Sequence, residues 1–132
     1  MKGKRPSDRD LLKIARMNAT AASRDLNEAD EVWVNHALFN VTQAAEKLIK
    51  YLCSDQDIDY DYSHNVVSLI DKLLEKGIDI PELVQDHAGQ YHHWVTRSRY
   101  TTSQLVQRSF VKKHLDCVND WLTREENRLT GI

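Results

Sequence analysis

A long amphipathic pattern between Val34 and Leu52 constrains the fold of this chain more than any other feature. Apolar residues recur there at steps of three and four, at Val34, Leu38, Val41, Ala45, Leu48 and Leu52. This spacing puts them on one face of a helix, while His36, Asn40, Gln43, Lys47 and Lys50 keep the same steps on the opposite face. We therefore expect a long helix whose apolar face supports the core and whose polar face is solvated.

The composition extends this expectation to the whole chain. Its 132 residues suit a single domain, and only four glycines and two prolines interrupt it. Alternating apolar and polar runs are nearly absent, which predicts an all-α fold: an up-and-down bundle of four to five helices with a long second helix. No apolar run approaches the ~18 residues that span a bilayer. We therefore expect no membrane contact. Because we interpret Cys53 and Cys117 as reduced thiols, we also expect a cytoplasmic location.

Capping residues and helix stops divide the chain into segments. We expect a disordered basic tip at residues 1–6, one domain at 7–126 and a frayed tail at 127–132. Within the domain, Ser7 begins the first helix, Asn27 caps the second, Ser63 or His64 opens the third, and Thr102 or Ser103 caps the last. Gly77 stops the third helix, and Pro81 opens a fourth that ends near Ser98. The last helix carries Val111, Leu115, Val118 and Leu122, and the chain frays from Thr123.

The sequence lacks the motifs of several common kinds of metal, cofactor and catalytic site. The acidic loop at residues 54–63 has neither the glycine nor the terminal glutamate of a calcium loop. His87, His92 and His93 are spaced by five and one, which does not put two imidazoles on one helical face, so we predict no metal site. Glycine-rich phosphate loops and GxSxG motifs are absent, and no cofactor is expected. The net charge of −2 argues against a non-specific nucleic-acid binder but permits a local basic patch.

Two groups of basic residues are candidates for such a patch. Lys47 and Lys50 share one helical face, and Arg97, Arg99 and Tyr100 close the fourth helix, where guanidinium groups and a phenol could hold phosphate and stack on a base. A solvated face is the alternative for the lysines, because Glu46 and Lys50 are four positions apart. Arginines near a helix C-terminus are also favoured by the helix dipole.

These residues occur in the order seen in HEPN domains, and the chain resembles that family. The order is QAAEKLIKYL (Gln43 to Leu52), an acidic loop, His64 with Leu69, and RSRY (Arg97 to Tyr100). The resemblance covers about Asp8 to Leu122 and implies a helical bundle, usually dimeric, associated with nucleotides and RNA. Some members are metal-independent ribonucleases, and others partner a small nucleotidyltransferase in toxin–antitoxin pairs. Carried over by position, the residues near the family's polar cleft are Lys47, Lys50, His64, Arg97, Arg99 and Tyr100.

The ribonuclease motif departs from its expected place. HEPN ribonucleases carry an arginine followed by a histidine after four to six residues, and neither Arg97 nor Arg99 has one. Arg108 and His114 have this spacing, but six positions turn a helix by about 240°, so the two side chains do not share a face.

We therefore expect a domain that binds a nucleotide or RNA, or docks a nucleotidyltransferase, without chemistry of its own. A ribonuclease using Arg108 and His114 is the first alternative. A dimeric interaction module without a ligand, anchored by Trp33, Trp94 and Trp121, is the second. His36 and Asn40 gain no support for a role in binding and stay assigned to the solvated face.

Overall fold

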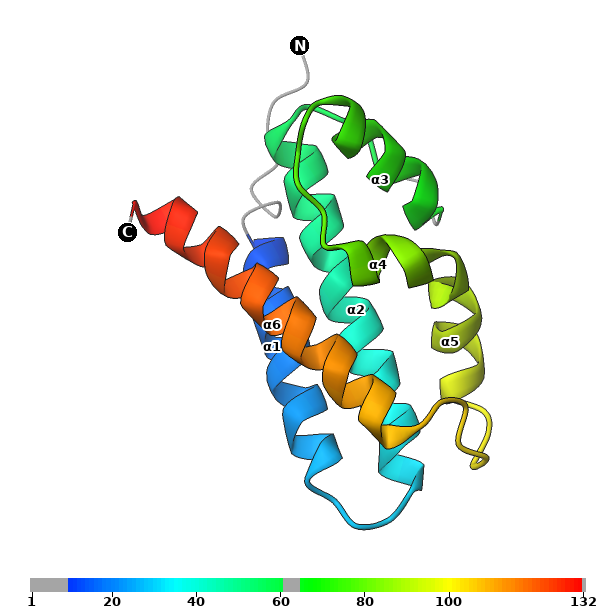
Figure 1. Ribbon diagram of the computed structural model, residues 1–132. Coiled ribbons are helices and arrows are strands. Elements are labelled where there is room, and N and C mark those ends of the chain that lie inside the picture. Colours follow the sequence, from blue (N-terminus) through cyan, green and yellow to red (C-terminus); the bar gives the residue numbers. More distant parts are fainter. Residues whose placement is uncertain (1–9, 61–64, 132) are drawn as a thin grey trace.

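The structure is a computed structural model that describes residues 10–60 and 65–131. Within those ranges it is an all-α bundle without strands, as the sequence predicts (Figure 1). Its elements are α1 (Asp10–Leu26), α2 (Val32–Asp55), α3 (Val66–Glu75), α4 (Glu82–His87), the 3₁₀ turn η2 (Ala88–Gln90), α5 (Tyr91–Ser98) and α6 (Arg108–Thr130). No described helix has the length and apolar character needed to cross a membrane.

Helix α2 is the centre of the bundle. It packs against α1, α3, α5 and α6, and in Figure 1 it runs between α1 and α6 on one side and α3 to α5 on the other. The predicted apolar stripe is confirmed, since all its members are buried: Val34, Leu38, Val41, Ala45, Leu48 and Leu52. The opposite stripe, from His36 to Lys50, is exposed or half-buried. The amphipathic pattern therefore fixes the orientation of α2 about its own axis.

Helix α1 lies against α2 through small side chains. It buries Ala15, Ala19 and Ala22 together with Leu12, and alanines allow two helices to approach closely. Ile14 of the same helix, by contrast, is 38% exposed.

The turn between α1 and α2 differs from the predicted helix start. Asn27 is not the cap of α2, which begins at Val32, and the intervening residues form hydrogen-bonded turns. The Asp30 side chain accepts a hydrogen bond from the Val32 backbone nitrogen at 3.0 Å. Asp30 therefore belongs to the connection and not to the first turn of α2.

The connection between α5 and α6 is also longer than predicted. Thr102 and Ser103 do not cap the last helix, which begins at Arg108. The buried Asn35 amide donates to the carbonyl oxygens of Thr101 and Ser103 at 3.2 and 2.9 Å, and its oxygen accepts from the Leu105 nitrogen at 3.1 Å. These bonds satisfy backbone groups of the connection without a helix, which explains the late start of α6.

Helix α3 is close to its prediction. Ser63 and His64 lie outside the described residues, and Asn65 is the N-cap, accepting a hydrogen bond from the Ser68 nitrogen at 3.2 Å. The helix stops before Gly77, whose φ of +78° is the left-handed conformation that glycine adopts without strain. Leu74 of this helix is 39% exposed.

The single helix predicted from Pro81 to Ser98 is broken into α4, η2 and α5. The break contains Gly89, a poor helix former, within the 3₁₀ turn. The broken segment still packs on the core, since it buries Val84, Ala88, Tyr91 and Trp94.

Helix α6 continues to Thr130, through the segment that was expected to fray. The Arg16 guanidinium of α1 bonds both carboxylate oxygens of Glu126, at 3.1 and 2.7 Å, and the side chains of Asn119 and Thr123 at 3.1 and 3.0 Å. The C-terminal half of α6 is therefore attached to α1. The predicted core positions of α6, from Val111 to Leu122, are buried.

Candidate ligand-binding groove

The polar face of α2 meets the end of α5 at a cavity, which we call the Arg99 cavity. It has a volume of about 340 Å³ and is lined by His36, Phe39, Asn40, Ser98 and Arg99. Three of these residues come from successive turns of α2 and two from the C-terminal end of α5. The cavity therefore lies at a helix–helix junction, a common place for ligands in helical bundles.

Aromatic rings flank the Arg99 guanidinium. Its central carbon lies 5.8 Å from the centroid of the Phe39 ring and 5.5 Å from that of Tyr100. The Nε group donates to the Val95 carbonyl oxygen at 3.3 Å. The two terminal amino groups donate to no acceptor in the described part of the chain. These groups form the fork that arginine uses to bind phosphate or carboxylate, so Arg99 has the chemistry to hold an anion.

Asn40 connects this cavity to α1. Its Nδ2 donates to Asp25 Oδ2 at 3.0 Å, and its Oδ1 accepts from Asn18 Nδ2 at 3.2 Å. Burial raises the pKa of Asp25, although the hydrogen bond from Asn40 and the nearby His36 oppose the shift. The His36 ring packs 5.1 Å from that of Trp33. The polar face of α2 therefore lies between α1 and α5.

Sequence reasoning missed His36 and Asn40. Both were assigned to the solvated face, yet both line the Arg99 cavity. Their position on one polar stripe with Lys47 and Lys50 was the available signal. The missing information was that the end of α5 packs beside Phe39, which periodicity within α2 does not reveal.

Lys47 and Lys50 lie on the same face of α2 but not at the Arg99 cavity. They follow Phe39 by 8 and 11 positions, or about 12 and 16 Å along the helix axis. Lys47 Nζ donates to Gln43 Oε1 at 2.8 Å, and Gln43 Nε2 donates to Glu46 Oε2 at 3.1 Å. Burial lowers the pKa of Lys47. The two lysines can act on a ligand at Arg99 only through their field or through a longer ligand.

The remaining predicted binding residues are exposed or undescribed. Tyr100 is 77% exposed, with its ring beside Arg99. Arg97 is exposed and lies two positions, or about 200°, around α5 from Arg99, so the two arginines point in different directions. His64 lies outside the described residues.

The contacts of Arg108 and His114 hold helices of the bundle together. Arg108 donates to the carbonyl oxygens of Leu26 and Glu28 at 2.6 and 3.1 Å and pairs with Glu31 at 3.4 Å, which ties the start of α6 to the α1–α2 turn. His114 is 1% exposed, and its Nε2 is hydrogen-bonded to the Tyr91 hydroxyl at 2.7 Å. Within one chain the two side chains do not meet at a cavity.

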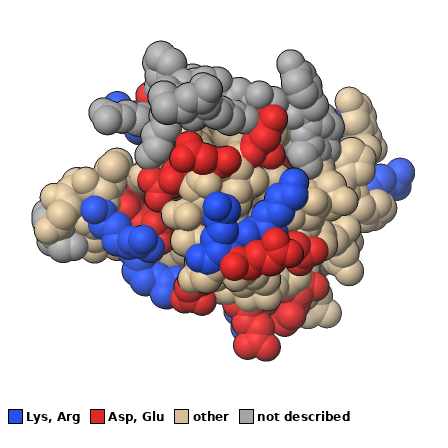
Figure 2. All heavy atoms as spheres, turned by 90° about the horizontal axis from the view of Figure 1, so that it is seen from above, with Lys and Arg blue, Asp and Glu red and all other residues tan. Residues whose placement is uncertain are grey.

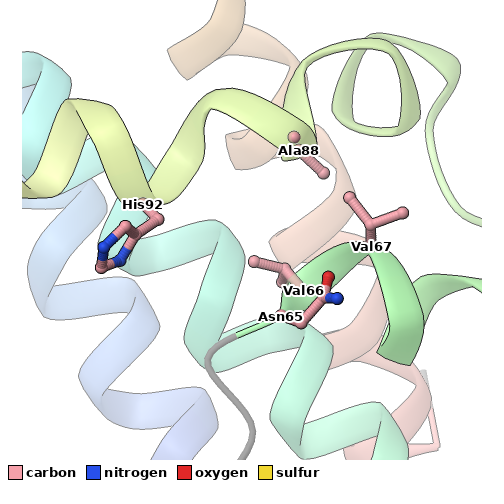
Figure 3. Close-up of a pocket in the computed structure, with 6 residues that line it drawn as sticks. Asn65, Val66, Val67, Ala88 and His92 are labelled. Atoms are coloured by element: carbon pink, nitrogen blue, oxygen red, sulfur yellow. The ribbon is translucent and has the colours of Figure 1, made fainter.

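A second cavity lies at the other end of α5 and is called the His92 cavity. Its volume is about 370 Å³, and its lining comes from the start of α3 and from the η2–α5 segment: Asn65, Val66, Val67, Ala88, Gly89 and His92. Figure 3 shows the two valines and Ala88 on one side and His92 extending from α5 on the other. The His92 cavity is thus mainly apolar. A third cavity, of about 660 Å³, is lined by Pro81 and by residues of α6 around Cys117 and holds none of the predicted site residues.

Charges of both signs are mixed on the surface. On the end of the molecule shown in Figure 2, Lys and Arg alternate with Asp and Glu. Within residues 10–60 and 65–131, no group of three or more His, Cys, Asp or Glu side chains is placed to hold a metal ion. Both cysteines are free thiols, and burial raises the pKa of Cys53 to about 11.

These features define a helical-bundle domain whose long second helix turns a polar face toward a cationic cavity. The HEPN domain family matches residues 9–127, most of the chain, and the protein belongs to this family. The resemblance drawn from the sequence motifs is thereby confirmed. No curated protein and no solved structure matches the chain.

Proposed function

We propose that this HEPN domain binds the phosphate of a nucleotide or of RNA in the Arg99 cavity, without chemistry of its own. Membership in the HEPN family supports a nucleotide- or RNA-related role. The observation that carries the finer proposal is the Arg99 guanidinium, which is flanked by the rings of Phe39 and Tyr100 and has two amino groups available for an oxyanion. A charge-assisted fork of this kind favours phosphate over neutral ligands.

The other predicted residues have supporting roles in this proposal. Tyr100 offers an exposed ring beside the phosphate, and His36 and Asn40 offer polar groups within the cavity. Arg97, Lys47 and Lys50 raise the local concentration of anions through their charge, and the family resemblance adds His64 to the proposed binding residues. In RNA, phosphates that extend beyond the cavity could reach Lys47 along α2.

A second candidate function is docking, either of another copy of the chain or of a nucleotidyltransferase in a toxin–antitoxin-type pair. It is favoured by exposed apolar side chains on α1 and α2: Met17 is 67% exposed, Ile14 38% and Trp33 37%. Methionine and aromatic residues are enriched at interfaces. Trp94 and Trp121, by contrast, are buried and unavailable as anchors.

The ribonuclease alternative gains no support from its proposed residues. Burial lowers the pKa of His114 to about 4, and its ring is enclosed by aromatic side chains. A general acid or base must reach the proton that it transfers. The binding function is therefore the better explanation of this site.

The proposal is tested by titrating the protein with adenosine monophosphate and with short single-stranded RNA at two salt concentrations. We expect measurable binding that weakens with salt and falls about tenfold or more in Arg99→Gln, because one charge-assisted phosphate contact contributes about 1.5–3 kcal/mol. Lys113→Gln is the matched control, since it removes the same charge from an exposed site on α6. Absence of binding at low salt, or equal affinities of the two variants, would refute the proposal.

A further inference from the structure

Helix α5 contributes residues to both cavities. His92 lines the cavity at its N-terminal end and Arg99 the one at its C-terminal end. Seven positions turn a helix by about 700°, so the two side chains leave α5 within roughly 20° of the same direction and about 10 Å apart along the axis. His92 and Arg99 therefore leave α5 on one face, and each lines one of the two cavities.

The two cavities differ in chemistry in a way that suits the two ends of a nucleotide. The Arg99 cavity holds a guanidinium flanked by rings, and the His92 cavity is lined by Val66, Val67 and Ala88 beside an imidazole. An anionic group is stabilised at the first, and a flat ring with polar edges at the second, where it can stack on His92 and contact the valines. The separation of His92 and Arg99 along the axis of α5, about 10 Å, is comparable to the length of an extended nucleotide.

We propose that one nucleotide lies lengthwise along α5, with its phosphate on Arg99 and its base in the His92 cavity. This inference rests on the proposed function and adds a base subsite that phosphate binding alone does not require. The nucleotide is either free or the terminal residue of an RNA, since both present the same base and phosphate. In this arrangement Tyr100 flanks the phosphate rather than stacking on the base.

Gly89 provides a way to close the base subsite. It lines the His92 cavity, and a Cβ added there would meet no atom within 4 Å. Its backbone does not have the positive φ that strains other residues. The backbone at Gly89 therefore has room for the Cβ of a larger side chain at the lining of the His92 cavity. Val67, which is partly exposed on α3, offers a second position at the same cavity.

The test compares a ligand that has a base with one that has none. Adenosine monophosphate, inorganic pyrophosphate and a short single-stranded RNA are each titrated into the full chain and into its Gly89→Leu and Val67→Trp variants. We expect both variants to weaken adenosine monophosphate about tenfold and to leave pyrophosphate within twofold of the unmodified chain. Arg99→Gln weakens all three ligands. His93→Ala, next to His92 but about 100° around α5, is the control and changes none of them.

The outcomes separate this inference from the proposed function. If Arg99→Gln weakens binding but neither cavity variant affects adenosine monophosphate, the base lies elsewhere, so the inference fails and the phosphate site stands. If no ligand binds, both fail. Should Gly89→Leu also weaken pyrophosphate, the variant has disturbed α5, and Val67→Trp decides by the same comparison. If the cavity variants lose RNA binding, the terminal nucleotide of RNA is a ligand of the site. If their RNA binding is unaffected, the ligand of the site is the free nucleotide.

Discussion

At the scale of single residues, His114 shows how strongly burial controls the chemistry of this chain. Its ring is packed between Tyr91, Trp94 and Phe110, with His87 nearby. Burial, together with the neighbouring His87, lowers its pKa to about 4. The imidazole is therefore neutral in the folded protein at ordinary pH, and its hydrogen bond with Tyr91 joins α5 to α6.

The lowered pKa of His114 predicts a loss of stability in acid. An unfolded histidine titrates near pH 6.5, so between about pH 6.5 and 4 the unfolded chain binds a proton that the folded chain does not. Stability contributed by this group is present above the unfolded pKa and falls as the pH drops through that window, by up to about 3 kcal/mol.

Urea denaturation at several pH values between 7 and 4 measures this effect. His114→Phe removes the titrating group, so we expect a shallower pH dependence than in the unmodified chain, even though the variant leaves the Tyr91 hydroxyl unpaired. The exposed His93→Gln is the control and keeps the steeper dependence. Identical slopes for His114→Phe and the unmodified chain would contradict the prediction.

At the scale of helices, the attachment of α6 to α1 depends on Arg16. Its fork bonds Glu126, Asn119 and Thr123 across the two helices. Arg16→Gln should lower the free energy of unfolding by about 1–2 kcal/mol, a modest value because the pair is partly exposed. Faster amide hydrogen exchange at residues 123–130 should accompany it. Lys13→Gln, at an exposed position of the same helix, is the control, and equal exchange in both variants would show that this end of α6 does not need Arg16.

The sequence predicts helices well where their signal is local. The core stripes of α2 and α6 follow from steps of three and four, because burial of one helix face depends on spacing alone. The ends of helices are less predictable because they depend on distant residues. The late start of α6 reflects contacts of Asn35 with residues 66 to 70 positions away, and the α1–α2 turn is held by Arg108, about 80 positions away.

The sequence predicts only part of the candidate site, because the site also depends on contacts between residues far apart in the chain. Arg99 and Tyr100 were singled out from the RSRY motif, and the structure brings Arg99 to a cavity. Lys47 and Lys50 share the polar face of α2 but lie further along it, and His36 and Asn40 were overlooked. Which part of a polar helix face becomes a binding site depends on what packs beside it, and that information is not contained in the helix itself.

At the scale of the whole molecule, the Arg99 cavity combines a guanidinium with aromatic rings, and the end of the molecule in Figure 2 carries charges of both signs. The net charge of −2 and the alternation of acidic and basic side chains make broad attraction of nucleic acid weak. Binding should therefore have a small salt dependence, in keeping with one or two phosphate contacts. A small salt dependence therefore distinguishes a specific nucleotide site from a general affinity for RNA.

The most direct test of the central claim is a nuclear magnetic resonance titration of the ¹⁵N-labelled protein with adenosine monophosphate. We expect saturable shifts at the Arg99 Nε group, at backbone amides of residues 92–100 and at residues 36–43 of α2, with a smaller response in α6. Shifts that are absent at millimolar nucleotide, or that cluster around Lys112 and Lys113 instead, would contradict the assignment of the Arg99 cavity as the nucleotide site.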